Sequence, residues 1–315
     1  MEQFAAGKVL RGRYRLDRIL GRGAMGHVWQ GTDVYLERPV AVKTVAAELL
    51  ALPDRRRTAL ACFEREAKAA ARPDHANLTT VYDAAVTEDV CCLVMQLVDG
   101  TTLDNVVDSA DDGRLPVSAA VSVAAQLCSG LSAAHAAGLV HRDLKPQNVM
   151  VRTSGLLKIL DFGLVKVLSD ADPQLTMTGE TLGNVAYAST ELLAGDRPLD
   201  GRSDLYAVGC LLHHMLTGRP PSDCPNPAEM ATRHLTEPPP RFTDHGVDAP
   251  PALQDLTHAL LAKRPEDRPG GAADVYAALA PYLPAPDPAF ATRRMPPEDP
   301  RRPFLVPQAP VMPRH

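Results

Sequence analysis

The sequence lacks a long uninterrupted apolar run, so it predicts no membrane span. The N-terminal stretch MEQFAAGKVLRGRYRL carries charges early and has no long apolar core, which excludes a secretory signal peptide. Six cysteines are present, but none forms a CxxC pair, and no Cys/His cluster has zinc spacing. We therefore expect reduced thiols. The most apolar stretch, residues 116–140, is interrupted by Ser, Gln and His, and it predicts a buried amphipathic helix.

The sequence also lacks the basic excess that is usual in nucleic-acid-binding proteins. Its 33 Lys and Arg residues face 38 Asp and Glu residues, which gives a formal net charge of -5. General binding of nucleic acid is therefore not expected. The hydrophobic share of 45% is ordinary for a globular protein, and the 315 residues can form one large domain or two smaller ones.

Local patterns divide the chain into a strand-rich part and a helix-rich part. Residues 13–45 surround a glycine-rich turn and predict strands, and two more strands follow in TTVYDAAV and VCCLVMQLV. In between, residues 55–72 hold strong helix formers, with no Gly or Pro before Pro73. Helical segments dominate from Thr101 onward, so we expect a boundary near residues 98–101.

The C-terminal residues have a different composition. Beyond about Pro284 the chain reads PAPDPAF and MPPEDPRRPFLVPQAP, which is rich in Pro and Arg. Such a composition offers little apolar surface to bury, so we predict that residues 284–315 are disordered. The alternative is a polyproline II segment that docks on a partner.

A glycine-rich loop, GRGAMGHV, runs from Gly21 to Val28. Glycines let backbone amides approach phosphate oxygens without an intervening Cβ atom. Alone this pattern is weak evidence, because a plain hairpin turn can contain it too. Dinucleotide binding would need a helix directly after Gly26, whereas residues 27–34 read as a strand.

A lysine occurs within the apolar strand VAVK. Lys43 needs a partner there, because an unpaired buried ammonium is costly. Glu66 in the following helix is the candidate, and Glu64 is its rival on a different helix face. Alternatively, the Lys43 ammonium reaches solvent along its aliphatic stem.

Polar groups crowd into the stretch HRDLKPQN, and DFG begins thirteen residues after Asn148. Asp143 can accept a proton from a hydroxyl, and Lys145 can offset charge on a transferred phosphoryl group. Asn148 and Asp161 offer the hard oxygen ligands that suit Mg²⁺. This set suits phosphoryl transfer, which depends on positioning and charge neutralisation more than on covalent chemistry.

The order of these motifs resembles the signature set of the protein kinases: GxGxxGxV, VAVK, a helix with Glu, HRDLKxxN and DFG. The resemblance extends over residues 14–283 and is closest to the eukaryotic-like Ser/Thr kinases of bacteria. It implies an α+β, bilobal fold. An ATP-binding, β-rich N-lobe would cover residues 14–98, and a helical C-lobe with the catalytic and activation loops would cover residues 99–283.

The resemblance implies an ATP site in which Lys43 holds the phosphates, Glu66 orients Lys43, and Met95 is the gatekeeper beside the hinge. The residues assigned to this site are Leu20, Gly21, Arg22, Gly23, Ala24, Met25, Gly26, His27, Val28, Ala41, Lys43, Glu66, Met95, Gln96, Leu97 and Val98.

The resemblance also implies the catalytic and supporting residues. Asp143 would be the catalytic base, assisted by Lys145. Asp161 and Asn148 would hold Mg²⁺, with Mn²⁺ as the alternative metal. Structural support would come from three further residues, namely Asp204, Glu191 and Arg268.

Two positions depart from the family pattern. The family usually has Thr at 184 and Pro at 190, where this chain has Asn184 and Thr190. The usual Thr contacts the catalytic Asp and Lys, and Asn184 replaces its hydrogen bonds in part. Loss of Pro is expected to loosen the backbone ahead of Glu191. An inactive, ATP-binding scaffold is therefore the alternative to an active enzyme.

Hydroxyl groups between DFG and Glu191 suggest regulation. In the family, the arginine at the position of Arg142 usually binds a phosphate on the activation loop. We predict autophosphorylation at Thr176 and Thr178, with Thr181 less favoured, and solvated hydroxyls as the alternative. The expected partners are protein substrates in a signalling role, and a homodimer for phosphorylation in trans.

A small-molecule phosphotransferase of related fold is a further alternative. It is disfavoured because such enzymes lack the long Thr-bearing segment that ends at Glu191 and the distant Arg268. Many relatives continue into a transmembrane helix and an extracellular sensor. Neither occurs before His315, so we expect a cytoplasmic protein.

Overall fold

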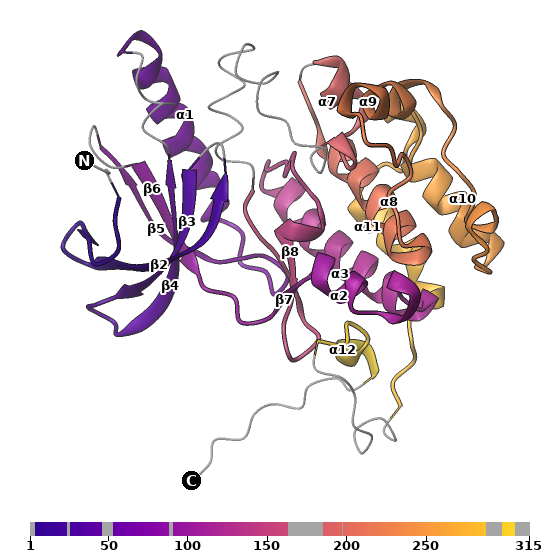
Figure 1. Ribbon diagram of the computed structural model, residues 1–315, viewed down its shortest axis with the longest axis horizontal. Coiled ribbons are helices and arrows are strands. Elements are labelled where there is room, and N and C mark those ends of the chain that lie inside the picture. Colours follow the sequence, from indigo (N-terminus) through magenta and orange to yellow (C-terminus); the bar gives the residue numbers. More distant parts are fainter. Residues whose placement is uncertain are drawn as a thin grey trace.

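The computed structural model describes residues 4–23, 26–45, 53–87, 91–162, 185–196, 198–287 and 298–305. Figure 1 shows two lobes: a sheet with one long helix, coloured indigo to purple, and a helical lobe, coloured magenta to yellow. The predicted α+β, bilobal architecture is confirmed.

The N-terminal lobe is built on a 6-stranded antiparallel sheet with the order β1-β2-β3-β4-β6-β5. The strands are β1 (Val9–Leu10), β2 (Tyr14–Gly23), β3 (Gly26–Asp33), β4 (Arg38–Val45), β5 (Val81–Val86) and β6 (Cys91–Gln96). Side chains alternate across a strand, so β4 directs Val42 into one apolar cluster and Ala41 and Val45 into the other. The second cluster includes residues of helix α1 (Pro53–Ala70), and Lys43 shares this face by parity.

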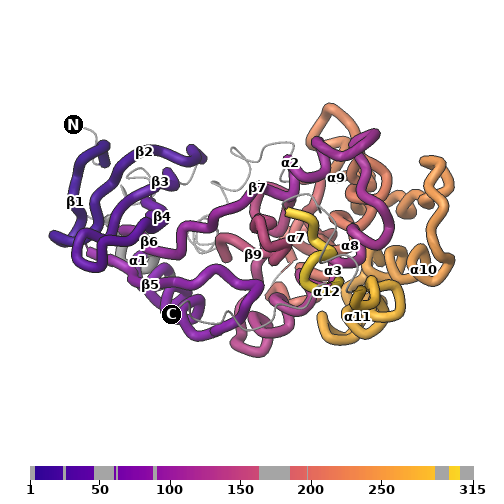
Figure 2. The backbone as a smooth tube through the Cα atoms, turned by 90° about the horizontal axis from the view of Figure 1, so that it is seen from below, coloured from indigo at the N-terminus to yellow at the C-terminus, as the bar shows by residue number. Residues whose placement is uncertain are grey.

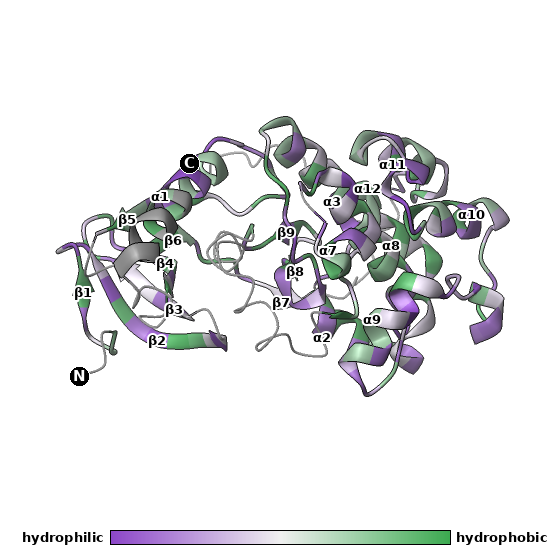
Figure 3. Cartoon of the chain, turned by 90° about the horizontal axis from the view of Figure 1, so that it is seen from above, coloured by the Kyte–Doolittle hydropathy of each residue, from purple (hydrophilic) through white to green (hydrophobic). Residues whose placement is uncertain are grey.

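Helices make up most of the C-terminal lobe. They are α2 (Leu103–Asp108), α3 (Val117–Ala136), α7 (Thr190–Ala194), α8 (Gly201–Thr217), α9 (Pro227–Thr236), α10 (Pro251–Leu260), α11 (Ala272–Leu279) and α12 (Arg302–Leu305). Short 3₁₀ turns lie at η2 (Asp111–Gly113), η3 (Pro146–Asn148), η4 (Phe242–His245), η5 (Pro265–Asp267) and η6 (Ala280–Tyr282). Helices α3 and α8 pack against each other in the middle of the lobe (Figure 2), and hydrophobic residues colour much of α8 (Figure 3).

Within the described ranges, α3 is the one helix that is long and apolar enough to cross a membrane by length and composition. However, 72% of its most apolar window is buried inside the protein. Helices α8 and α11 cover it. The expected burial of this segment is confirmed, although most of the helix circumference is covered rather than one face, which explains its sparse polar content.

A 3-stranded sheet lies where the two lobes meet, with strands β7 (Thr101–Thr102), β8 (Val149–Val151) and β9 (Leu157–Ile159). Strands β8 and β9 form a hairpin around the turn at residues 153–155. Asn148 directly precedes β8, and Asp161 follows β9, so the base of this hairpin carries both predicted metal ligands. The amide of Thr79 donates to the carbonyl of Ile159 at 3.1 Å, which fastens the loop between α1 and β5 to the hairpin.

Part of the segment that we predicted to be disordered is folded. Residues 298–305 pack on the helical lobe beside the β8–β9 turn and include α12, which Figure 1 shows in yellow beneath α3. Asp299 and Leu305 are 7% and 6% exposed. The prediction of disorder is therefore wrong for residues 298–305, because a few apolar side chains and backbone hydrogen bonds are enough to dock them.

Candidate active site

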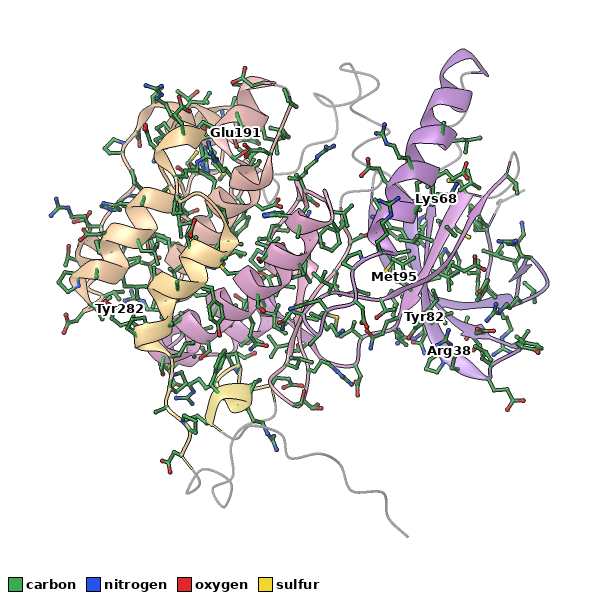
Figure 4. All side chains as sticks on the ribbon, turned by 180° about the vertical axis from the view of Figure 1, so that it is seen from behind. Arg38, Lys68, Tyr82, Met95, Glu191 and Tyr282 are labelled. Carbon is green, nitrogen blue, oxygen red and sulfur yellow. The ribbon has the colours of Figure 1, made fainter. Side chains whose placement is uncertain are left out.

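The antiparallel sheet brings the predicted adenine contacts together. Val28 on β3 is the pairing partner of Lys43 on β4, and Ala41 is the pairing partner of Met95 on β6. Figure 4 labels Met95 on this sheet. The register thus places the predicted phosphate-binding lysine and the predicted gatekeeper on neighbouring strands, within one part of the sheet.

The glycine-rich loop is the turn of the β2–β3 hairpin. Gly23 pairs with Gly26, and the next residues continue as strand β3, so the dinucleotide-binding alternative is excluded for lack of a following helix. Gly26 has φ +136, a conformation that L side chains rarely adopt. Ala24 and Met25, at the tip of the loop, lie outside the described residues.

Lys43 forms an ion pair across the two lobes. Its Nζ lies 2.6 Å from Oδ2 of Asp161, and both side chains are largely buried. The expected pair with Glu66 is not formed, since the Glu66 carboxylate lies 3.3 Å from the guanidinium of Arg65 instead. A lysine within an apolar strand needs a nearby buried counter-charge, and Asp161 provides it from the other lobe.

Asp143 is held within a small polar network. Nζ of Lys145 lies 3.2 Å from Oδ2 of Asp143, and Nδ2 of Asn148 donates to the same oxygen at 3.1 Å. Asn148 also donates to the Asp143 carbonyl at 2.7 Å. These contacts fix the carboxylate while a fifth of its surface stays open, as a proton acceptor requires.

Asp204 on α8 braces the loop that carries Asp143. Its carboxylate accepts the backbone N–H of His141 at 2.8 Å and of Arg142 at 2.9 Å, and Nε2 of His135 donates to it at 2.8 Å. Arg142 has φ +64, a strained value for a side-chain-bearing residue. A buried carboxylate with three donors explains how this turn is held.

His141 is a positioning residue that the sequence reasoning did not assign. Its Nε2 donates to the carbonyl of Leu160 at 2.7 Å, and its ring packs on Phe162 with ring centroids 5.1 Å apart. It therefore ties the Asp143 loop to the strand end that carries Asp161. Its place at the start of HRD, two residues before Asp143, was the available signal.

Glu191 and Arg268 form a buried bidentate pair in the helical lobe, with N···O distances of 2.8 and 2.7 Å. Figure 4 labels Glu191 there, far from Met95. The hydroxyl of Thr190 donates to the carbonyl of Lys263 at 2.6 Å and accepts from Arg268 at 3.0 Å. Thr190 therefore supplies hydrogen bonds that a proline at this position could not make.

The donor set at the base of the β8–β9 hairpin fits a magnesium ion. Oδ1 of Asp161 is buried and has no hydrogen-bond partner within the described ranges. Asn148 lies close in the fold, because its backbone carbonyl accepts from the amide of Leu160 at 2.8 Å, and it would offer its amide oxygen. No cluster of three or more His, Cys, Asp or Glu forms a metal cage in the described part of the chain. Mg²⁺ is commonly held by one or two protein ligands together with phosphate oxygens.

Several predicted residues cannot be placed. The activation-segment residues Thr176, Thr178, Thr181 and Asn184 lie outside the described residues, as does Gly163 of DFG. Their roles stay predictions.

Comparison with known proteins is consistent with this geometry. The model of the protein kinase domain matches residues 14–279. The serine/threonine-protein kinase pkn3 of Myxococcus xanthus is 38% identical over 278 residues, which cover 84% of this chain and 49% of that protein. The serine/threonine-protein kinase PknB of Mycolicibacterium smegmatis is 35% identical over 274 residues, covering 86% of this chain and 43% of that protein. The chain thus spans less than half the length of these relatives.

A solved structure is also similar. The kinase domain of Mycobacterium tuberculosis PknI superimposes with a TM-score of 0.68 at 26% sequence identity. The match covers 89% of this chain and 100% of that one. The two-lobed arrangement is therefore shared over nearly the whole solved domain.

Proposed function

Because the chain belongs to the protein kinase family, we propose that it transfers the γ-phosphoryl group of ATP to Ser and Thr hydroxyls of proteins. The observation that carries this proposal is the environment of Asp143, whose carboxylate is held by Lys145 and Asn148 and stays partly exposed. Such an arrangement suits a base rather than covalent catalysis.

The protein substrate would enter beside Asp143. A recess there is lined by Asp143, Lys145, Tyr187, Ser189 and Leu192. A Ser or Thr hydroxyl placed in this recess would donate its proton to Asp143, while Lys145 offsets charge on the phosphoryl group in transfer. The Asp204 brace keeps the base in place during this step.

ATP would lie between the β2–β3 hairpin and the base of the β8–β9 hairpin. Lys43 would bind its phosphates, and Asp161 and Asn148 would hold Mg²⁺, which neutralises phosphate charge when bound. The buried Oδ1 of Asp161, which has no hydrogen-bond partner within the described residues, supports this assignment. Binding of phosphates by Lys43 would compete with its ion pair to Asp161, so the pair is expected to rearrange when nucleotide binds.

The remaining assignments concern regulation and location. We propose autophosphorylation at Thr176 and Thr178 in trans between two copies of the chain, and a cytoplasmic signalling role. The cationic side chain of Arg142, adjacent to Asp143, supports binding of a phosphorylated loop.

The test is incubation of the purified protein with labelled Mg-ATP, followed by mapping of phosphorylated sites. Asp143→Asn should lower incorporation by about 10²–10⁴-fold, because the base is lost while its shape is kept. The matched control is Asp255→Asn, on the exposed surface of α10, which should keep parental activity. Nucleotide binding without any transfer by the parent would support the scaffold alternative and contradict the proposed activity.

A further inference from the structure

Residues 298–305 are joined to the helical lobe by several independent contacts. The carbonyl of Pro300 accepts from Nε2 of Gln126 on α3 at 3.1 Å, and the carbonyl of Leu305 accepts from the amide of Asp287 at 3.0 Å. Leu305 is buried, and Phe304 packs on the main core. The segment also satisfies its own polar groups, because Asp299 accepts a bidentate pair from Arg301.

The turn of the β8–β9 hairpin is shaped to receive this segment. Gly155 has φ +77, and a Cβ atom there would overlap the carbonyl oxygen of Asp299 and approach Cβ of Arg302 to 2.9 Å. The backbones of residues 155 and 299 therefore meet at a distance that only glycine permits. Such close fit indicates a specific seat rather than a chance contact.

Gln126 connects this seat to the rest of the molecule. Its Nε2 donates to the carbonyls of both Pro300 and Gly155, and its Oε1 accepts from the amide of Leu157 at 2.9 Å and from Asn77 at 3.1 Å. All four hydrogen bonds of the buried amide are thus made. Withdrawal of residues 298–305 would leave one of its donors without a protein partner.

The hairpin held in this way carries catalytic groups at its other end. Asn148 precedes β8, Asp161 follows β9, and the chain between them is held by Gln126 and residues 298–305 at the turn. We propose that residues 298–305 are a brace, which fixes the β8–β9 hairpin and thereby positions Asn148 and Asp161 for Mg-nucleotide. The docking of residues 298–305 does not depend on the proposed function, whereas its effect on nucleotide binding rests on it.

Hydrogen exchange of the 315-residue chain tests the docking without any need for activity. Leu305→Asp places a charge in a buried apolar position, so exchange at residues 153–159 should become about tenfold faster or more. The matched control is Leu235→Asp on α9, whose side chain is 40% exposed and which should leave this region unchanged. Unchanged exchange in Leu305→Asp would overturn the docking.

Gly155→Ala provides a second, independent test. When residues 298–305 are docked, the Cβ atom added by Gly155→Ala would clash with the carbonyl oxygen of Asp299. When Leu305→Asp has released these residues, only the strained backbone conformation of residue 155 remains as a cost. The accelerations caused by Gly155→Ala and Leu305→Asp should therefore be less than multiplicative when combined. Effects that multiply would show that Gly155 and the brace act separately, which would contradict the proposed seat.

The positioning effect is measured by Mg-ATP affinity rather than turnover. Leu305→Asp should weaken binding of Mg-ATP about threefold or more, and should weaken binding of ATP with EDTA less, because the brace acts through the metal ligands. Equal weakening in both conditions, or none, would overturn the positioning role even if exchange confirms docking. A parent chain that binds no nucleotide would instead overturn the proposed function, and the exchange result would still decide the docking.

Discussion

Two ion pairs join distant parts of this chain, and their surroundings differ. Lys43 and Asp161 keep 17% and 20% of their side chains exposed, and one oxygen of Asp161 has no hydrogen-bond partner in the described part of the chain. Arg268 and Glu191 are 0% and 10% exposed. The Arg268 guanidinium also donates to the carbonyls of Ala262 and Arg202 and to the hydroxyl of Thr190.

Because of this difference, Lys43 and Asp161 can exchange each other for new partners, whereas Arg268 and Glu191 cannot. A pair that keeps about a fifth of each side chain exposed and has a spare oxygen can take a new charged partner at lower cost, because water and ligand can replace the lost contact. A fully enclosed pair cannot, because removal of one partner leaves a buried charge uncompensated. The lobe interface thus carries the adjustable pair, and the helical lobe carries the fixed one.

Breaking the fixed pair should have the largest effect. Arg268→Ala should lower the free energy of unfolding by about 3–5 kcal/mol, because Glu191 is left buried without its partner. The control is Arg233→Ala, which breaks an exposed Arg–Glu pair on α9 and should cost at most about 0.5 kcal/mol. Urea unfolding of both variants measures the contrast, and equal losses would contradict the comparison.

The second largest effect should be a loss of stability of the helical lobe at acid pH. Burial lowers the pKa of His213 and of His234 to about 4. The unfolded chain binds protons at these residues near their usual pKa of about 6.5, so the free energy of unfolding should fall as pH drops from 6.5 towards 4. Each histidine can contribute up to about 3 kcal/mol over this range.

Urea unfolding at several pH values between 7 and 4.5 would measure this loss. His213→Gln should flatten the profile, because glutamine does not titrate. A profile with the same slope in the variant would assign the loss to other groups, such as His214, whose pKa burial also lowers.

Substitutions of Thr190, which contacts the fixed Arg268–Glu191 pair, should have an intermediate effect on the free energy of unfolding. Thr190→Val keeps the shape but removes the hydroxyl that donates to the Lys263 carbonyl and accepts from Arg268, so it should destabilise by about 1–3 kcal/mol. Thr190→Ser restores the hydroxyl and should recover most of the loss. Thr190→Pro fits the first position of α7 but lacks the hydroxyl, so recovery there would show that the backbone, not the hydrogen bonds, matters.

The adjustable pair should give the smallest effect on stability. Lys43→Met should change the free energy of unfolding by about 1 kcal/mol or less, because the pair is partly open to water. The same variant should weaken Mg-ATP binding clearly, since the phosphates lose their cation. Isothermal titration beside urea unfolding separates the two, and a large stability loss with unchanged affinity would reverse our assignment of this pair.

Motif spacing was a good guide to local structure and a poor guide to one pairing. The strands around the glycine-rich loop and the helix ending before Pro73 follow from alternation and propensity, which are local properties. The partner of Lys43 depends on how the two lobes approach, and no local pattern encodes that. In this structure Lys43 therefore pairs with Asp161, and the orienting role expected of Glu66 stays a prediction.

The brace shows a second limit of sequence reasoning. Pro and Arg dominate the C-terminal residues, so average composition predicted disorder for all of them. Docking of residues 298–305 depends on a few positions, above all the buried Leu305 and the backbone of Gly155, which has no Cβ atom, and an average does not register them. A short apolar pair within a proline-rich stretch, here Phe304 and Leu305, was the available signal.

The apolar character of α3 has a consequence for synthesis of the chain. Its covering helices, α8 and α11, begin only at residues 201 and 272, so α3 leaves the ribosome long before its neighbours exist. Until then α3 exposes an apolar surface like that of a membrane-spanning helix, which favours aggregation and binding by chaperones. Nascent chains halted before residue 272 should therefore stay protease-sensitive, and emergence of α11, which ends at residue 279, should be the step that protects them.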